Sequence, residues 1–243
     1  MKKLLFTIVF AVALCFYVSG ASAVLIGGIE KIGPVADSGS GFGNVSNILT
    51  LQNPSFDNNT EIGKVSWSVT GDVRSDDATN SSQTWLFSAI FGKGITDASQ
   101  LGIVYNVNQQ GNLGGLTTTL NYFSLQVYDL AGNEVFSTDP NICVGCGTGF
   151  VPIAQGTGGA GYLFDLDSAA EVALNFYFET PDRRASYRLG ATGSVSLAND
   201  GPDNFFFAKI SGVTPVPEPV SMLLFGTGLV GIGGYMRKKF KQN

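Results

Sequence analysis

Residues 117–130 read TTTLNYFSLQVYDL, and residues 131–137 continue with AGNEVFS. Residues 117–130 and 134–137 are rich in aromatic and β-branched side chains, which favour β-strands. Ala131, Gly132 and Asn133 lie between them and provide a turn signal. We therefore predict a β-hairpin here, and the same reasoning extends to the rest of the chain.

Alternation of apolar and polar residues predicts further half-buried strands. Val65, Trp67 and Val69 alternate with polar neighbours, and the apolar residues from Val172 to Phe178 follow the same two-residue period. Only 168–174 could open as one short helical turn. The predicted strands are 64–70, 85–91, 101–107, 117–130, 134–137, 172–179, 186–197 and 205–210.

Glycine-rich and asparagine-rich turns separate these strands, and no internal repeat has a fixed period. Many short strands between turns predict an all-β domain, either an antiparallel β-sandwich or a jelly roll. The domain would span 24–212, which is long enough to bury a full core. Residues 213–216, with Pro215, form a short stiff linker behind it.

The first 23 residues have the three parts of a secretory signal peptide. Lys2 and Lys3 form a basic start, and residues 4–18 are apolar. Ala21 and Ala23 provide small residues for cleavage after position 23. We expect a signal helix that is removed on export.

The C-terminal residues 217–243 also have three parts. Pro217, Glu218 and Pro219 precede the apolar segment 220–236, which contains no charge and is near the lower length limit for a membrane-spanning helix. The tail 237–243 is basic and should remain cytoplasmic, leaving 24–212 outside. Its stop-transfer cations are Arg237, Lys238, Lys239 and Lys241.

The order of this tail resembles the PEP-CTERM sorting signal of Gram-negative bacteria. The resemblance implies recognition of Pro217, Glu218 and Pro219 by an exosortase, an integral-membrane transpeptidase. It implies membrane retention by 220–236, then release to the cell surface or extracellular matrix. Val220 departs from the usual small polar residue after the motif. The resemblance covers about a tenth of the chain and implies nothing about 24–212.

Charge and composition narrow the function of the middle region. Residues 24–216 carry eight basic and 18 acidic side chains, a net charge of −10, which does not suit a nucleic-acid-binding face. The chain has no histidine, which removes histidine-dependent nucleophiles and the usual zinc sites. We expect no enzymatic activity and no cofactor. Calcium is the one metal that remains open.

Three acidic pairs are candidates for carboxylate chemistry. Asp165 and Asp167 would share one face of an extended strand and could form a glycosidase pair. An oxygen-rich turn at 199–204 could hold calcium. Solvated carboxylates and a plain turn are the favoured interpretations of these patterns. The pairs are Asp165 with Asp167, Asp76 with Asp77, and Asp200 with Asp203.

Cys143 and Cys146 are the only cysteines after the signal peptide. Because an exported protein meets an oxidising compartment, we expect a local disulfide rather than a redox or zinc site. Tyrosines on the strands could stack against sugars, although tyrosine also simply favours strands. The four candidates are Tyr105, Tyr122, Tyr128 and Tyr177.

These patterns predict a non-enzymatic exported surface or matrix protein that an exosortase sorts. The resemblance implies an association with exopolysaccharide. Two alternatives remain open: a lectin-like carbohydrate-binding module, with or without calcium, and a glycan hydrolase that uses two carboxylates.

Overall fold

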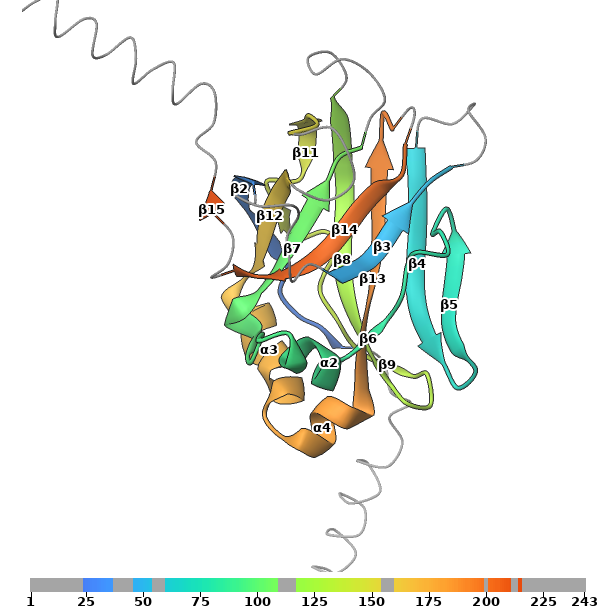
Figure 1. Ribbon diagram of the computed structural model, residues 1–243, viewed down its shortest axis with the longest axis vertical. Helices are drawn as coiled ribbons and strands as arrows, with labels where there is room; N and C mark the ends of the chain where they lie inside the picture. The colour runs from blue at the N-terminus through green and yellow to red at the C-terminus, as the bar shows by residue number, and fades with distance from the viewer. Residues whose placement is uncertain are drawn as a thin grey trace, which may run out of the picture.

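Two β-sheets form most of the protein in the computed structural model (Figure 1). The structure describes residues 24–36, 46–53, 60–108, 117–153, 160–198, 201–210 and 214–215. The predicted signal peptide with Ala21 and Ala23 lies outside these residues, as do Pro217–Pro219, the apolar segment and the basic tail from Arg237 to Lys241. Within the described ranges, no helix is long and apolar enough to cross a membrane.

The first sheet contains the predicted hairpin. Its main order is β1-β9-β8-β13-β4-β5, with β11 beside β8 and β6 beside β13. Neighbours are antiparallel except β1 and β9. The strands are β1 (Val24–Leu25), β4 (Thr60–Ser68), β5 (Gly71–Asp76), β6 (Trp85–Leu86), β8 (Thr118–Asp129), β9 (Glu134–Ser137), β11 (Gly147–Phe150) and β13 (Tyr187–Ser196).

The hairpin prediction is confirmed, since β8 and β9 pair across a tight turn. The backbone N–H of Gly132 donates to the carbonyl oxygen of Asp129 at 3.1 Å. Gly132 has φ of 89°, a conformation that favours glycine.

The second sheet has the order β10-β2-β12-β7-β14-β3, with β15 also paired to β2. Only β10 and β2 are parallel in it. The strands are β2 (Ile29–Ala36), β3 (Ser46–Leu51), β7 (Leu101–Asn106), β10 (Cys143–Val144), β12 (Ala160–Leu166), β14 (Asp203–Lys209) and β15 (Thr214–Pro215).

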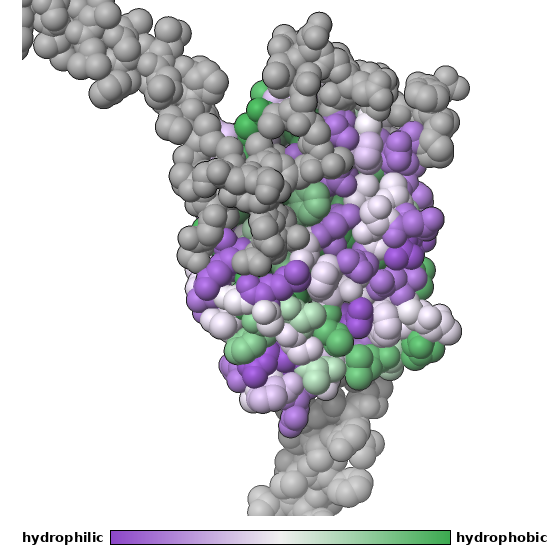
Figure 2. Space-filling view, viewed as in Figure 1, coloured by the Kyte–Doolittle hydropathy of each residue, from purple (hydrophilic) through white to green (hydrophobic). Residues whose placement is uncertain are grey.

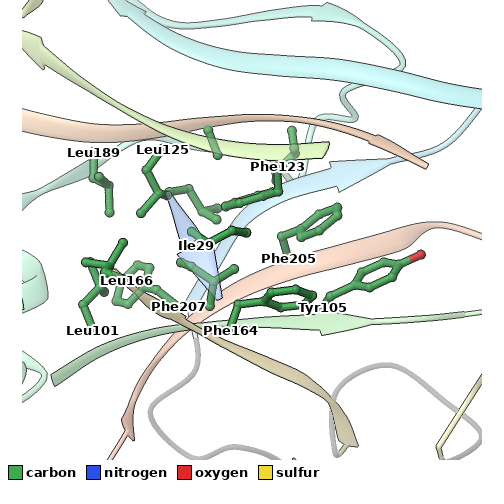
Figure 3. Packing of buried hydrophobic residues seen from close by; sticks show 14 of the residues in the cluster. Ile29, Leu101, Tyr105, Phe123, Leu125, Phe164, Leu166, Leu189, Phe205 and Phe207 are labelled. Carbon is green, nitrogen blue, oxygen red and sulfur yellow. The ribbon is translucent and has the colours of Figure 1, made fainter. Parts of the chain in front are cut away.

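The core lies between the two sheets (Figure 3). Phe123 of the first sheet stacks on Phe205 of the second, with ring centroids 4.7 Å apart. Tyr105 also stacks on Phe205, with ring centroids 4.8 Å apart. All three side chains are fully buried, and each contributes on the order of 2 kcal/mol by leaving water. The all-β prediction is confirmed, and the two sheets pack as in a β-sandwich.

The predicted strand at 172–179 is wrong, because these residues belong to helix α3 (Ser168–Phe178). Asp167 caps the helix: its Oδ1 accepts from the backbone N–H of Ala170 at 2.8 Å. Ala170, Leu174 and Phe178 are buried at helical spacing. The apolar pattern therefore belongs to one helix face rather than one strand face.

The predicted strand at 85–91 is also wrong beyond its first two residues. The chain leaves β6 and forms helix α2 (Phe87–Gly92), which buries Phe87 and Ile90. The ring of Phe87 packs edge-on against Phe178 of α3, with centroids 5.0 Å apart. Helix α4 (Pro181–Ser186) and the 3₁₀ turn η1 (Ala98–Gln100) complete the helical elements described. Figure 1 shows α2, α3 and α4 together at the lower end of the sandwich.

The view in Figure 2 shows mainly hydrophilic side chains over the β4 and β5 region and hydrophobic ones along its lower edge. Val69 and Val73 of the β4–β5 hairpin and Leu130 of the β8–β9 turn are exposed hydrophobic residues.

Candidate functional site

A pocket of about 780 Å³ lies along one edge of β8. It combines residues from the start of β8, from the segment between β9 and β11 together with the first residue of β11, and from β13. The lining consists of Thr119, Leu120, Asn121, Tyr122, Pro140, Asn141, Cys143, Cys146, Gly147 and Thr192. This volume is typical of small-molecule sites.

The pocket exists because two strands share this edge of β8 and leave a gap. β11 pairs with residues 118–120, and β9 pairs with residues 126–128. Between them, residues 121–124 have no strand partner on this edge in the part of the chain that the structure describes. The chain spans the gap by crossing to the second sheet as β10 and returning as β11.

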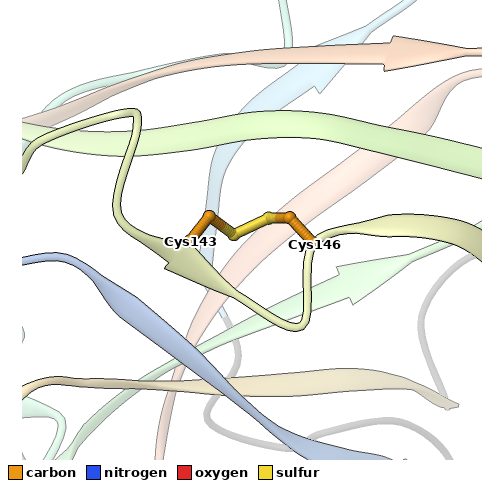
Figure 4. The surroundings of a disulfide bond; sticks show 2 residues. All are labelled: Cys143 and Cys146. Carbon is orange, nitrogen blue, oxygen red and sulfur yellow. A yellow bond between two sulfur atoms is a disulfide. The ribbon is translucent and has the colours of Figure 1, made fainter.

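A disulfide between Cys143 and Cys146 closes the turn of this crossing, beside β8 (Figure 4). The two Cα atoms are 5.4 Å apart, and both cysteines line the pocket. Gly145 inside the turn has φ of 83°, and a Cβ there would lie 2.5 Å from the Cβ of Lys31. The bridge therefore forms part of one wall of the pocket, and Gly145 allows the turn to pack closely against Lys31.

Several polar groups of the lining have no role in the fold. The hydroxyls of Tyr122 and Thr119 make no hydrogen bond within the described ranges. Asn141 donates from its side-chain N–H to Asp139 at 2.9 Å, which leaves its carboxamide oxygen for a ligand. By contrast, Asn121 is held by the hydroxyl of Ser194 at 3.0 Å. The pocket thus offers hydroxyl and amide groups that a ligand could use.

The four candidate tyrosines differ in burial, and only one of them lines the pocket. Tyr105 is fully buried, and its hydroxyl shares a 3.0 Å hydrogen bond with Thr118. Tyr128 is buried as well. Its pKa is raised mainly by burial and to a smaller extent by the charge of Glu134. Tyr177 packs among the helices, where burial raises its pKa to about 12. Tyr122 is half-buried and lines the pocket. It alone of the four is placed to meet a ligand there.

The expected pairing of Asp165 and Asp167 on one strand face does not form. β12 ends at Leu166, so Asp167 lies outside the strand as the cap of α3. Its second oxygen accepts from the backbone N–H of Gly28 at 2.6 Å. The pKa of Asp165 is raised mainly by burial and to a smaller extent by the charge of Glu30. Neither carboxylate lines the pocket.

The other acidic candidates have structural contacts. Oδ2 of Asp77 accepts from the backbone N–H of Ile62 at 2.9 Å. Asp203 is fully buried and accepts from the backbone N–H of Asn108 at 3.1 Å. Asp200 lies outside the described residues. In the ranges that the structure describes, no cluster of three or more acidic, cysteine or histidine side chains could hold a metal ion.

Sequence analysis missed Glu61, a buried acid on the core side of β4. Its Oε1 accepts from the backbone N–H of Asn53 at 3.1 Å. Burial raises its pKa to about 7, against the lowering effect of that hydrogen bond. The spacing of Glu61 and Val65 was the available signal, since residues four apart on a strand share a face.

Comparison with known proteins identifies only the tail. No curated protein and no solved structure matches the chain. Residues 215–238 match the model of the PEP-CTERM protein-sorting motif. The predicted sorting signal is therefore present, and it supports export of the protein through the membrane to the cell surface and processing by an exosortase.

Proposed function

We propose that this chain is a non-enzymatic surface or extracellular-matrix protein that associates with exopolysaccharide after an exosortase has processed its tail. The observation that carries the proposal is the sorting motif at 215–238 behind a folded β-sandwich. A sorted, folded domain needs only a binding surface to act in an envelope or matrix.

The uses of the acidic side chains support a non-catalytic role. The carboxylate of Asp167 accepts hydrogen bonds from two backbone N–H groups, and Asp203 is buried in the sandwich. Among the described residues that line the pocket, none is a carboxylate that could serve as a general acid or base. A glycan hydrolase built on Asp165 and Asp167 is accordingly the less favoured alternative.

A lectin-like module is the second candidate, and the position of Tyr122 favours it. Aromatic rings and uncommitted hydroxyl and amide groups are the groups with which proteins hold sugars. This candidate is compatible with the first, because a matrix protein can attach to polysaccharide through one such pocket.

The sorting part of the proposal is tested by a C-terminal tag and cell fractionation, in cells that contain an exosortase. We expect wild-type protein outside the cell without its tag. Glu218→Ala should remain in the membrane with the tag attached, because Glu218 is the only charge between Lys209 and Arg237 and is the natural recognition group. Glu179→Ala, which removes an exposed carboxylate from the sandwich, is the matched control and should be processed normally. Wild-type protein that keeps its tag in the membrane would refute exosortase sorting.

A further inference from the structure

We propose that the pocket beside β8 binds a neutral saccharide without calcium, with a sugar ring against Tyr122. This inference rests on the proposed function and identifies its ligand class and site. It is argued from the charge, the free polar groups and the apolar walls of the pocket.

The charge of the pocket favours an uncharged ligand. None of its ten lining residues is acidic or basic. Asp139 lies directly behind the lining and accepts the backbone N–H of Asn141 at 2.8 Å. The surrounding region 24–216 has ten more acidic than basic side chains. Lys31 lies against the Cys143–Cys146 turn, but its ammonium group lies over the rings of Phe150 and Tyr162 and is not part of the lining. An anionic polysaccharide would therefore meet net repulsion here.

The polar groups fit a ligand with many hydroxyls. The hydroxyls of Tyr122 and Thr119 can each donate and accept, and the oxygen of Asn141 can accept. These groups have no protein partner among the described residues, so a ligand could bond to them without breaking the fold. Sugar hydroxyls both donate and accept, which matches this set.

The apolar parts of the lining fit the faces of sugar rings. Leu120, Pro140 and the disulfide provide surfaces without hydrogen-bonding demand. Tyr122 adds an aromatic ring that is half-buried in the lining. A rigid aromatic ring contacts a ligand at low entropic cost. None of the described lining residues is a carboxylate, which favours binding without calcium.

The test uses the full chain in a zwitterionic detergent, because sugar-based detergents would compete. The probes are an array of neutral gluco-, manno- and galacto-oligosaccharides and a matched set of uronic-acid oligosaccharides. We expect binding to at least one neutral probe, unchanged by EDTA, and none to the acidic set. Titration calorimetry with the best probe then measures the affinity of the variants.

Tyr122→Ala should weaken binding by about tenfold or more, as expected for a buried aromatic contact. Tyr122→Phe, which keeps the ring, should lose less. Asn141→Ala alters an exposed side chain and should weaken binding without disturbing the fold. Phe206→Ala removes a half-buried aromatic ring from the second sheet and is the matched control, with unchanged affinity.

Binding only to acidic probes, loss of binding in EDTA, or equal affinity of Tyr122→Ala and wild type would each overturn the proposal. Absence of binding to every neutral probe would overturn it as well. The sorting assay is independent of these outcomes, because Tyr122→Ala should still lose its C-terminal tag. Failure of the saccharide site is therefore distinguishable from failure of the proposed function.

Discussion

Replacement of Glu61 by glutamine should stabilise the protein at neutral and alkaline pH. Glu61 is 4% exposed and projects from the first sheet toward the core. Its Oε2 is buried and has no hydrogen-bond partner among the residues that the structure describes. Burial, and to a smaller extent the charge of Glu61, raises the pKa of Asp203, which is fully buried on the second sheet. The charged form of Glu61 is thus unfavourable in the folded protein.

The size of the effect follows from its pKa. Burial raises it from 4.5 to about 7, and one pKa unit corresponds to about 1.4 kcal/mol. Between pH 4.5 and 7 the folded state holds a proton that the unfolded state has lost, so the free energy of unfolding falls as pH rises. The full penalty is about 3 kcal/mol above pH 7. Glutamine keeps an oxygen for Asn53 but buries an N–H₂ group, which costs about 1 kcal/mol.

The assay is urea unfolding followed by circular dichroism, at intervals from pH 4 to pH 8. We expect Glu61→Gln to exceed wild type by about 2 kcal/mol at pH 8 and to lose this advantage as pH falls toward 4. Glu179→Gln is the control, because it removes an exposed ion pair with Arg183 and should change stability by only a few tenths of a kcal/mol. A difference between Glu61→Gln and wild type that stays constant across this pH range would refute the reasoning.

Two further predictions concern the helix cap and the disulfide. Asp167→Ala should lower the free energy of unfolding by about 2–3 kcal/mol, since it removes acceptors from Gly28 and Ala170, and an unchanged urea midpoint would exclude this role. Cys143→Ser with Cys146→Ser should cost no more than about 2 kcal/mol and leave the domain folded, because the bridge closes a very short loop. A circular dichroism spectrum without sheet signal in the double variant would contradict that expectation.

The sequence predicted strands well where their signals are local. The β8–β9 hairpin has both strand propensity and a glycine turn between the strands, and both partners are neighbours in sequence. β2 was not predicted, because Gly33 and Pro34 interrupt its pattern. Its strand conformation depends on pairing with β12, which lies more than a hundred residues later. Pairing between strands so far apart in the sequence cannot be predicted from the residues of β2 alone.

The helices were misread because two periodicities coincide. Leu174 and Phe178 are four residues apart, a spacing that places residues on one face of a strand and also of a helix. Phe176 distinguishes the two, since it is 43% exposed although a strand would bury it with them. The cap that Asp167 provides for α3 is a second signal that favours the helix.

The pocket could not be predicted, because its walls come from residues near 120, 140 and 192 that the fold brings together.

The position of the pocket in the fold is relevant to the processing of the tail. β10, with Cys143, pairs with β2 at Ile29 and Glu30, whereas β15 pairs with Val35 and Ala36.

These two positions on β2 are about 20 Å apart at the usual rise of a strand. β15 ends at Pro215, the residue at which the match to the sorting motif begins, and it pairs with the end of β2 that lies far from the pocket wall. None of the lining residues belongs to the region from 214 onward. Removal of the tail at the motif should therefore leave both the sandwich and the pocket unchanged, which is what a protein that acts after processing requires.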